Sequence, residues 1–232
     1  MAIAADRTYQ EGSAATAPES RRRPSVEIRY RAFDIVAASA LLILFMPLML
    51  VIAVVIRFES RGRAIFRQRR LGRSQSQFTV HKFRTMQQGA SQDVHREFVL
   101  GLIAGQAPPE TEEGPRFKLA GDDRITRAGR ILRRYSLDEL PQLWDVLRGD
   151  MSLVGPRPAL PYEAERYPAH WFGRFAVKPG ITGLWQVSGR SELTMEEMIR
   201  LDLEYVERRS LRLNIWVVLR TLPAVVSARG AG

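Results

Sequence analysis

Residues 35–56 read IVAASALLILFMPLMLVIAVVI, a run of 22 residues without a charged side chain. At about 1.5 Å per residue, a helix over this run is about 33 Å long, enough to cross a hydrocarbon core roughly 30 Å thick. A secretory signal does not fit, because the run is too long, starts too late and is followed by no small-residue cleavage pattern. The run predicts a membrane helix, with a helix buried in a soluble core as the alternative.

Arginines flank this run at both ends, whereas a spanning helix is more basic at its cytoplasmic end. They are Arg21, Arg22, Arg23, Arg29 and Arg31 before it, and Arg57, Arg61, Arg63, Arg67, Arg69, Arg70 and Arg73 after it. Pro47 near the middle removes a backbone N–H and predicts a break. We therefore expect a re-entrant helix over residues 25–57, broken near Pro47, with both ends on the cytoplasmic face. A kinked spanning helix is the alternative.

The bulk composition suits one domain with an anionic partner. The chain has 232 residues, a formal net charge of +10 and no cysteine, which excludes disulfides and thiolate chemistry. The positive charge fits nucleic acid, an acidic lipid surface or phosphorylated substrates. No nucleic-acid-binding motif is present, so we do not expect nucleic acid as a partner.

The rest of the chain predicts an α+β fold that is mostly α, with a small β element and interfacial amphipathic helices. We expect a disordered basic tail over residues 1–24 and a cytoplasmic catalytic domain over residues 58–232. Short strands are expected around the turn at residues 72–74. Residues 87–121 are polar and predict a loop or insertion with one short helix.

Helical spacing recurs in the second half of the chain. One helix is expected from Ile125, and a second after the capping box formed by Thr194 and Glu197. Asn214 is expected to cap a last helix through Val226. This helix either lies in a membrane interface or completes the core.

Asp138 and Glu139 are adjacent carboxylates within the segment Leu137–Leu143 (LDELPQL). They fit the first turn of a helix, where Ser136 and Glu139 would form a capping box and acidic residues favour the helix dipole. The same position also stabilises a carboxylate as a nucleophile or a metal ligand. Both readings stay open on the residues alone.

Four cations on three segments are candidates for phosphate binding. Arg157 lies between two prolines in Gly155–Pro158, a rigid setting that suits a bidentate contact with phosphate or a structural carboxylate. Lys82 and Arg84 are two apart on a candidate strand and so share a face, with a solvated face as the alternative. A glycine-punctuated loop from Gly180 ends in Arg190, but its spacing fits no P-loop or dinucleotide fingerprint. His81, His95 and His170 have no metal-ligand spacing.

Five blocks, taken in order, resemble one family, the bacterial sugar transferases, or monotopic phosphoglycosyl transferases, from about Tyr30 to Val226. The blocks are Arg31–Asp34, Lys82–Met86, Ser136–Leu143, Gly149–Pro158, and Lys178–Gly183 continuing to Gly189-Arg190. Met46 stands where some members have Ser. The short basic tail resembles compact members, whereas longer ones carry further transmembrane helices and a domain ahead of this region.

The resemblance implies an enzyme that moves a sugar 1-phosphate from a UDP-sugar, with galactose or glucose preferred, to undecaprenyl phosphate. It implies Asp138 as the nucleophile and Glu139 as the ligand of Mg²⁺. It also implies phosphate binding by Arg133, Arg157 and Arg190, with Lys82 and Arg84 in support.

The implied setting is the cytoplasmic face of a bacterial inner membrane, where membrane lipids are further partners and a homo-oligomer is compatible with the sequence. The implied role is the first membrane step of exopolysaccharide or other surface-glycan synthesis. The alternatives are a non-catalytic basic scaffold, a membrane-attached polyanion binder, and an inactive relative that regulates an active partner.

Overall fold

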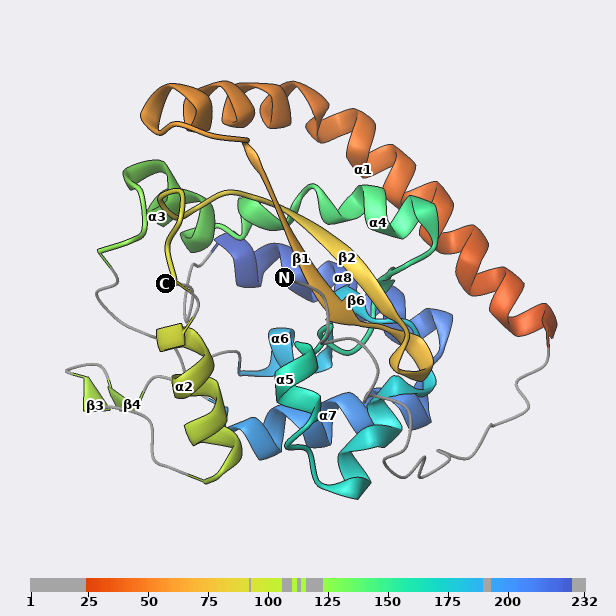
Figure 1. Ribbon diagram of the computed structural model, residues 1–232. Helices are drawn as coiled ribbons and strands as arrows, with labels where there is room; N and C mark the ends of the chain where they lie inside the picture. Colours follow the sequence, from red (N-terminus) through yellow and green to blue (C-terminus); the bar gives the residue numbers. More distant parts are fainter. Residues whose placement is uncertain are drawn as a thin grey trace, which may run out of the picture.

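The computed structural model describes residues 24–91, 93–105, 110–111, 114–115, 123–189 and 193–226. The predicted tail, apart from Pro24, and Arg190 lie outside the described residues, as does part of the segment 87–121. Helices make up most of the described chain, which also contains three two-stranded sheets (Figure 1). The predicted α+β class, with more helix than strand, is confirmed.

The elements follow one another as helices and short strands. The helices are α1 (Pro24–Glu59), α2 (Asp93–Ile103), α3 (Arg127–Arg134), α4 (Gln142–Arg148), α5 (Pro161–Ala164), α6 (Leu184–Ser188), α7 (Met195–Arg208) and α8 (Leu211–Val226). The strands are β1 (Ile65–Leu71), β2 (Gln77–Phe83), β3 (Glu110–Thr111), β4 (Gly114–Pro115), β5 (Ser152–Val154) and β6 (Gly180–Thr182). Short 3₁₀ segments cover Arg73–Gln75, Leu137–Glu139 and Ala169–Ala176.

The long helix α1 continues through Pro47, so the predicted break there is wrong. Its 36 residues make it about 54 Å long at 1.5 Å per residue. Figure 1 shows it bent over α3 and α4 rather than divided in two. A proline removes one hydrogen bond from a helix, which can bend it without ending it. Within the described residues, α1 is the one helix long and apolar enough to cross a membrane, and only 11% of its most apolar stretch is buried.

The predicted strands around residues 72–74 are confirmed as an antiparallel hairpin. β1 pairs with β2 from Ile65 opposite Phe83 to Leu71 opposite Gln77. At the tip, Ser74 and Gln75 adopt left-handed backbone conformations, with φ of 52° and 60°. β5 and β6 form a separate parallel pair. The predicted short helix within residues 87–121 corresponds to α2.

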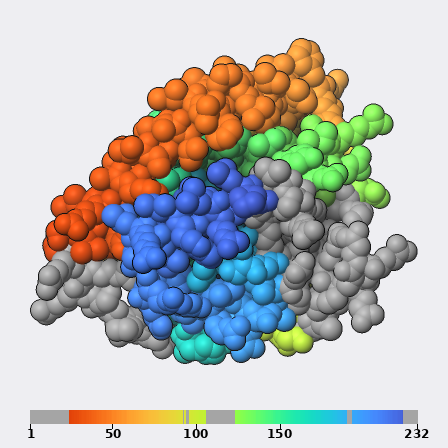
Figure 2. All heavy atoms as spheres, turned by 180° about the vertical axis from the view of Figure 1, so that it is seen from behind, coloured from red at the N-terminus to blue at the C-terminus, as the bar shows by residue number. Residues whose placement is uncertain are grey.

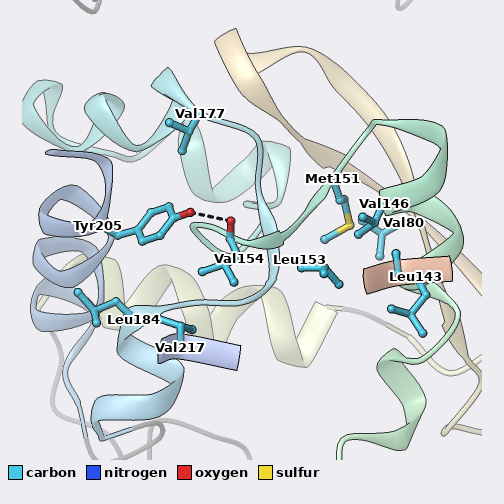
Figure 3. Close-up of a cluster of buried hydrophobic side chains, with 11 residues drawn as sticks. Val80, Leu143, Val146, Met151, Leu153, Val154, Val177, Leu184, Tyr205 and Val217 are labelled. Carbon is cyan, nitrogen blue, oxygen red and sulfur yellow. Dashed lines mark hydrogen bonds between the residues drawn. The ribbon is translucent and has the colours of Figure 1, made fainter. Parts of the chain in front are cut away.

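The main hydrophobic core lies between the hairpin, α4, the β5–β6 pair, α7 and α8 (Figure 3). Met151, Val146 and Val217 are completely buried in it. The Tyr205 hydroxyl donates a hydrogen bond to the Val154 carbonyl at 2.9 Å, which joins α7 to β5 (Figure 3). The core thus fixes β5, and with it the loop that follows β5.

The N-terminal cap of α7 agrees with the sequence prediction, whereas that of α8 does not. The capping box of Thr194 and Glu197 at the start of α7 is confirmed. The predicted cap at Asn214 is wrong, because α8 begins at Leu211 and the Ser210 hydroxyl accepts from the Leu213 N–H. Asn214 is instead buried inside α8, where its side-chain amide lies 2.9 Å from the Tyr205 hydroxyl.

Candidate active site

Asp138 and Glu139 lie in the 3₁₀ turn between α3 and α4. The capping box predicted at Ser136 is wrong, because Ser136 is left-handed, with φ of 52°, and its side chain caps nothing. The backbone N–H of Glu139 bonds to the Ser136 carbonyl at 3.2 Å instead. The two carboxylates therefore come from a tight turn rather than from the first turn of a regular helix.

Two leucines attach this turn to the long apolar helix. Leu137 and Leu140 pack against a buried cluster that contains Ile52 and Ile56 of α1 and Phe83 of β2. Apolar contacts of this kind remove hydrocarbon surface from water, which is the main force that holds a short turn in place. The carboxylates are thus fixed next to the C-terminal half of α1.

A lysine on the hairpin contacts one of the two carboxylates. Lys82 Nζ lies 2.6 Å from Glu139 Oε1, and the two side chains are 26% and 27% exposed. Water screens a pair of this exposure, so its net contribution to stability is about 1 kcal/mol or less. Both groups can therefore change partner at little cost when an anion or a cation arrives.

Arg133 is held beside the carboxylates by Thr85. Its Nε donates to Thr85 Oγ1 at 2.9 Å, and the Thr126 N–H donates to the Thr85 carbonyl at 3.0 Å. A Cβ atom at Gly129 would overlap that same carbonyl oxygen, so α3 and residue 85 approach as closely as two backbones can. Thr85 thus sets both the position of α3 and the direction of Arg133.

The electrostatic environment separates the two carboxylates. Burial raises the pKa of Asp138 to about 6, and the negative charge of Glu139 also raises it, whereas Lys82 and Arg133 lower it. A carboxyl group with this pKa is ionised at pH 7, when it can act as a nucleophile, and it is protonated below about pH 5.

Arg84, the other cation predicted on β2, lies elsewhere. Its guanidinium donates to the carbonyls of Ser60, at 2.9 Å, and Arg61, and weakly to that of Ile56, at 3.5 Å. These carbonyls lie at the C-terminal end of α1, where a helix leaves its last carbonyl groups without partners. The structure therefore places Arg84 at a helix terminus and not beside the carboxylates.

Arg157 is exposed on a loop whose backbone is held from several sides. Its carbonyl accepts from Arg174 Nη2 at 2.9 Å, and the next carbonyl, of Pro158, accepts from Arg70 Nη1 at 3.0 Å. The Gly155 N–H donates to Thr182 of β6 at 2.9 Å. The backbone of the loop is therefore held rigidly, and the exposed Arg157 side chain still lies close enough to the buried Arg70 and Asp202 for its charge to act on both.

Buried charges lie behind this loop. Arg174 Nη2 forms an ion pair with Asp202 Oδ2 at 2.6 Å, and both side chains are almost fully buried. Burial raises the pKa of Asp202 to about 6, although the charge of Arg174 lowers it. Burial likewise lowers the pKa of Arg70 to about 10, an effect that the positive charge of Arg157 increases. The loop therefore depends on polar groups that have no access to water.

The hairpin separates Arg157 from the carboxylates. Ala159 pairs with Leu71 at the tip of the hairpin, whereas Lys82 lies near its other end, five residues along β2 from Gln77. Five strand residues span about 17 Å. The structure thus brings Asp138, Glu139, Lys82 and Arg133 together, and it places the Arg157 backbone about one hairpin length away.

The carboxylate pair suits a divalent cation that also binds substrate. Among the described residues, no three His, Asp or Glu side chains are grouped as a metal site. Mg²⁺ commonly takes only one or two carboxylates from the protein and completes its shell with water and substrate phosphates. Glu139, half-exposed beside Asp138, fits that arrangement.

Two residues that fix the site were recognised in the sequence only as part of a motif, and no role was predicted for either. Arg31 donates to the carbonyls of Val146 and Leu147, at 2.5 Å each, and so caps α4. Asp34 accepts from Leu153 at 2.9 Å, which joins α1 to β5. Both residues lie in the block Arg31–Asp34, so this block joins α1 to α4 and to β5.

A buried pair beside Lys82 was also missed. His81 Nδ1 lies 2.6 Å from Asp145 Oδ1, and the His81 N–H donates to Asp145 Oδ2 at 2.9 Å. Asp145 is completely buried on α4. This pair fixes β2 against α4, one residue from the lysine that contacts Glu139.

Comparison with known proteins identifies close relatives over most of the chain. The family model described as "Bacterial sugar transferase" matches residues 26–228. The chain is 38% identical to the "Exopolysaccharide production protein ExoY" of Rhizobium meliloti, over 90% of each chain. It is 40% identical to a "UDP-glucose:undecaprenyl-phosphate glucose-1-phosphate transferase" of Caulobacter vibrioides, over 90% of this chain and 74% of the other. It is 41% identical to an "Undecaprenyl-phosphate galactose phosphotransferase" of Salmonella typhimurium, over 87% of this chain and 41% of the other.

Proposed function

Because the chain belongs to the bacterial sugar transferase family and is an undecaprenyl-phosphate sugar phosphotransferase, we propose that Asp138 carries the sugar phosphate as a covalent intermediate. In the proposed reaction a UDP-sugar and undecaprenyl phosphate give undecaprenyl-diphosphate sugar and UMP. The observation that supports this best is the position of Asp138, an ionisable carboxyl beside Lys82 and Arg133, on a turn packed against α1.

The first step is attack by an Asp138 oxygen on the phosphorus that bears the sugar. A bond forms between that oxygen and the phosphorus, the bond from the phosphorus to the bridging oxygen breaks, and UMP leaves with the bonding electrons. Phosphoryl transfer requires positioning and charge neutralisation more than acid–base groups. Lys82 and Arg133 supply two positive charges next to the reacting carboxylate.

The second step returns Asp138 to its free form. A phosphate oxygen of undecaprenyl phosphate attacks the same phosphorus, and the aspartyl oxygen leaves as a carboxylate. One site then serves a water-soluble donor and a lipid acceptor in turn. Leu137 and Leu140, which pack on α1, hold the nucleophile where a lipid phosphate at the membrane surface can reach it.

Glu139 is the residue that would hold Mg²⁺. Glu139 follows Asp138 directly in the turn, and its side chain is partly exposed. Its ion pair with Lys82 is also partly exposed and therefore weak, so a cation can replace the lysine. When bound, Mg²⁺ neutralises charge on the diphosphate of the donor. Arg157, on the loop beside the tip of the hairpin, is proposed to bind a phosphate of the donor on the basis of its motif.

The proposed location is the cytoplasmic face of a bacterial inner membrane, with α1 embedded in the bilayer. The bent, mostly exposed α1 and the arginines at both of its ends support a helix that enters and leaves by the same face. A tilted span is the other arrangement that the same helix allows.

The proposed donor is UDP-glucose or UDP-galactose, because the names of two relatives specify glucose or galactose. The proposed role is the initiation of an exopolysaccharide, supported by the name of the relative from Rhizobium meliloti. Arg190, which lies outside the described residues, remains a proposed phosphate ligand on the basis of its motif.

The test is UMP release by the detergent-purified full chain with Mg²⁺, undecaprenyl phosphate and a panel of UDP-sugars. We expect release that needs lipid and metal and is lost in Asp138→Asn, while the exposed control Glu207→Gln keeps it. Without lipid, we expect at most one UMP per chain and label from the sugar phosphate on the protein. Full activity of Asp138→Asn would refute the nucleophile, and a wild type inactive with every donor would favour a non-catalytic basic scaffold.

A further inference from the structure

A groove that the proposed reaction does not use lies where α7 meets α8. Its volume is about 290 Å³, and it is lined by Arg208, Ser210, Arg212, Leu213 and Trp216. Tyr30 near the start of α1 donates to the Arg209 carbonyl at 3.0 Å, so the groove adjoins the N-terminal end of α1. The carboxylates pack near Ile52, 22 residues further along that helix, or on the order of 30 Å away.

The groove is basic at its mouth. Arg212 is exposed, and no described residue forms a hydrogen bond or ion pair with its guanidinium. Arg208 is also exposed and pairs with Glu204 one turn earlier on α7, a contact that water weakens. Two further acids lie nearby: Glu207 is exposed on α7, and Glu27 pairs with Arg209 at 2.9 Å. An anion that enters the groove therefore meets one free guanidinium and one that is loosely held.

Next to the groove, α8 exposes a row of large apolar side chains. Ile215, Trp216, Leu219 and Leu222 are 49%, 41%, 62% and 62% exposed, whereas Val217 and Asn214 on the opposite side are buried. Arg220 lies over the Trp216 ring, 5.4 Å from its centre. An indole beside arginines, above an apolar helix face, is typical of a helix in the interface between lipid headgroups and acyl chains.

This face of α8 and the long helix α1 lie on one side of the molecule. Figure 2 shows α8 in blue directly beside α1 in orange and red. A bilayer that receives α1 therefore also meets α8. The groove then lies at the depth of the lipid phosphates, with the apolar row deeper.

We propose that this groove binds the phosphate headgroup of an anionic membrane phospholipid, with the exposed row of α8 against the acyl chains. Arg208 and Arg212 bind the phosphate, and Trp216 forms the wall between headgroup and chains. The inference rests on the membrane location of α1 but not on the proposed chemistry, since no group of the groove takes part in the transfer.

The experiment measures lipid binding to the full chain in neutral detergent by native mass spectrometry, with dioleoylphosphatidylglycerol and dioleoylphosphatidylcholine. We expect the wild type to retain phosphatidylglycerol preferentially. The preference should fall by about fivefold for each arginine removed, or about 30-fold in Arg208→Gln/Arg212→Gln. The matched control Arg166→Gln/Arg200→Gln removes two exposed arginines outside the groove and should keep the preference.

Three results would overturn the proposal: equal retention of both lipids by the wild type, an unchanged preference in the groove variant, or displacement of the lipid by millimolar inorganic phosphate alone. A dimer that is lost in Leu219→Ser would assign this face to a second copy of the chain instead. UMP release in the same detergent should be equal in wild type and groove variant, so failure of this proposal is distinguishable from failure of the proposed function.

Discussion

The turn that carries Asp138 and the loop that carries Arg157 are held by opposite means. The turn rests on two leucines packed against α1, and its Glu139 forms a partly exposed and therefore weak pair with Lys82. The loop is fixed by backbone hydrogen bonds and by the buried pair of Arg174 and Asp202. If the proposed roles are correct, the nucleophile lies beside partners that it can exchange, whereas the phosphate-binding arginine lies on a loop with a fixed backbone.

The largest effect should come from the turn. Asp138→Asn removes the nucleophile and should lower UMP release by about 10⁴-fold or more, as loss of a nucleophile does in other covalent enzymes. The variant should be no less stable than wild type at pH 8, because the raised pKa of Asp138 means that the folded state disfavours its ionised form.

The raised pKa of Asp138 also determines how the stability of the wild type relative to Asp138→Asn changes with pH. The contribution of Asp138 is fully present below its unfolded pKa of about 4 and is lost as the pH rises through about 6. Thermal unfolding of the wild type and of Asp138→Asn at pH 4 and pH 8 therefore measures this difference. A variant that is markedly less stable at pH 8 would show that the turn, like the loop, is fixed by charge.

The next largest effect should come from the buried ion pair that fixes the Arg157 loop. Asp202→Asn leaves the buried Arg174 without a counter-charge and should cost about 3 kcal/mol or more of unfolding free energy. Glu204→Gln on the same helix breaks an exposed pair and should cost less than about 1 kcal/mol. Denaturant unfolding in detergent measures both, and equal losses would contradict the claim that the buried pair fixes the loop.

A smaller effect is expected in the dependence of kcat/KM on pH, on the acidic side. With the pKa of Asp138 at about 6, kcat/KM should fall about tenfold for each pH unit below 6 and be constant above 7. Asp202 has a raised pKa in the same range, so the profile of Asp202→Asn separates the two carboxyls. An acid limb that disappears in that variant would assign it to the loop and not to the nucleophile.

The smallest effect should follow from Thr85→Val, which removes one hydrogen bond to Arg133 and keeps the shape of the side chain. One such bond corresponds to about a two- to tenfold loss of kcat/KM. The control Thr79→Val changes the same residue type on β2, two residues before His81 and away from Arg133. If Thr85→Val behaves like its control, Arg133 is positioned by other contacts.

Local patterns predicted what depends on neighbouring residues. The long apolar helix, the hairpin turn and the capping box of Thr194 each follow from a few adjacent side chains, and the carboxylate pair was visible as a motif. Ser136 was assigned a standard cap because its left-handed backbone leaves no trace in the residue type. Pro47 was expected to break a helix that its many other hydrogen bonds keep continuous.

Partners far away in the chain could not be predicted. Arg84 and Arg31 both cap helices that are distant in sequence, but an arginine near a candidate site has the same identity whether it binds phosphate or a carbonyl. Asp202 lies on a helix with ordinary amphipathic spacing, and only its 2.6 Å contact with Arg174 distinguishes it from a surface acid.

The contact at Gly129 has a consequence for how this protein tolerates change. Because any Cβ there would overlap the Thr85 carbonyl, a library that varies every position should recover only glycine at residue 129. The residue carries no side chain and has no role in the proposed chemistry. In a selection for activity it should nevertheless be as intolerant of substitution as the proposed nucleophile Asp138.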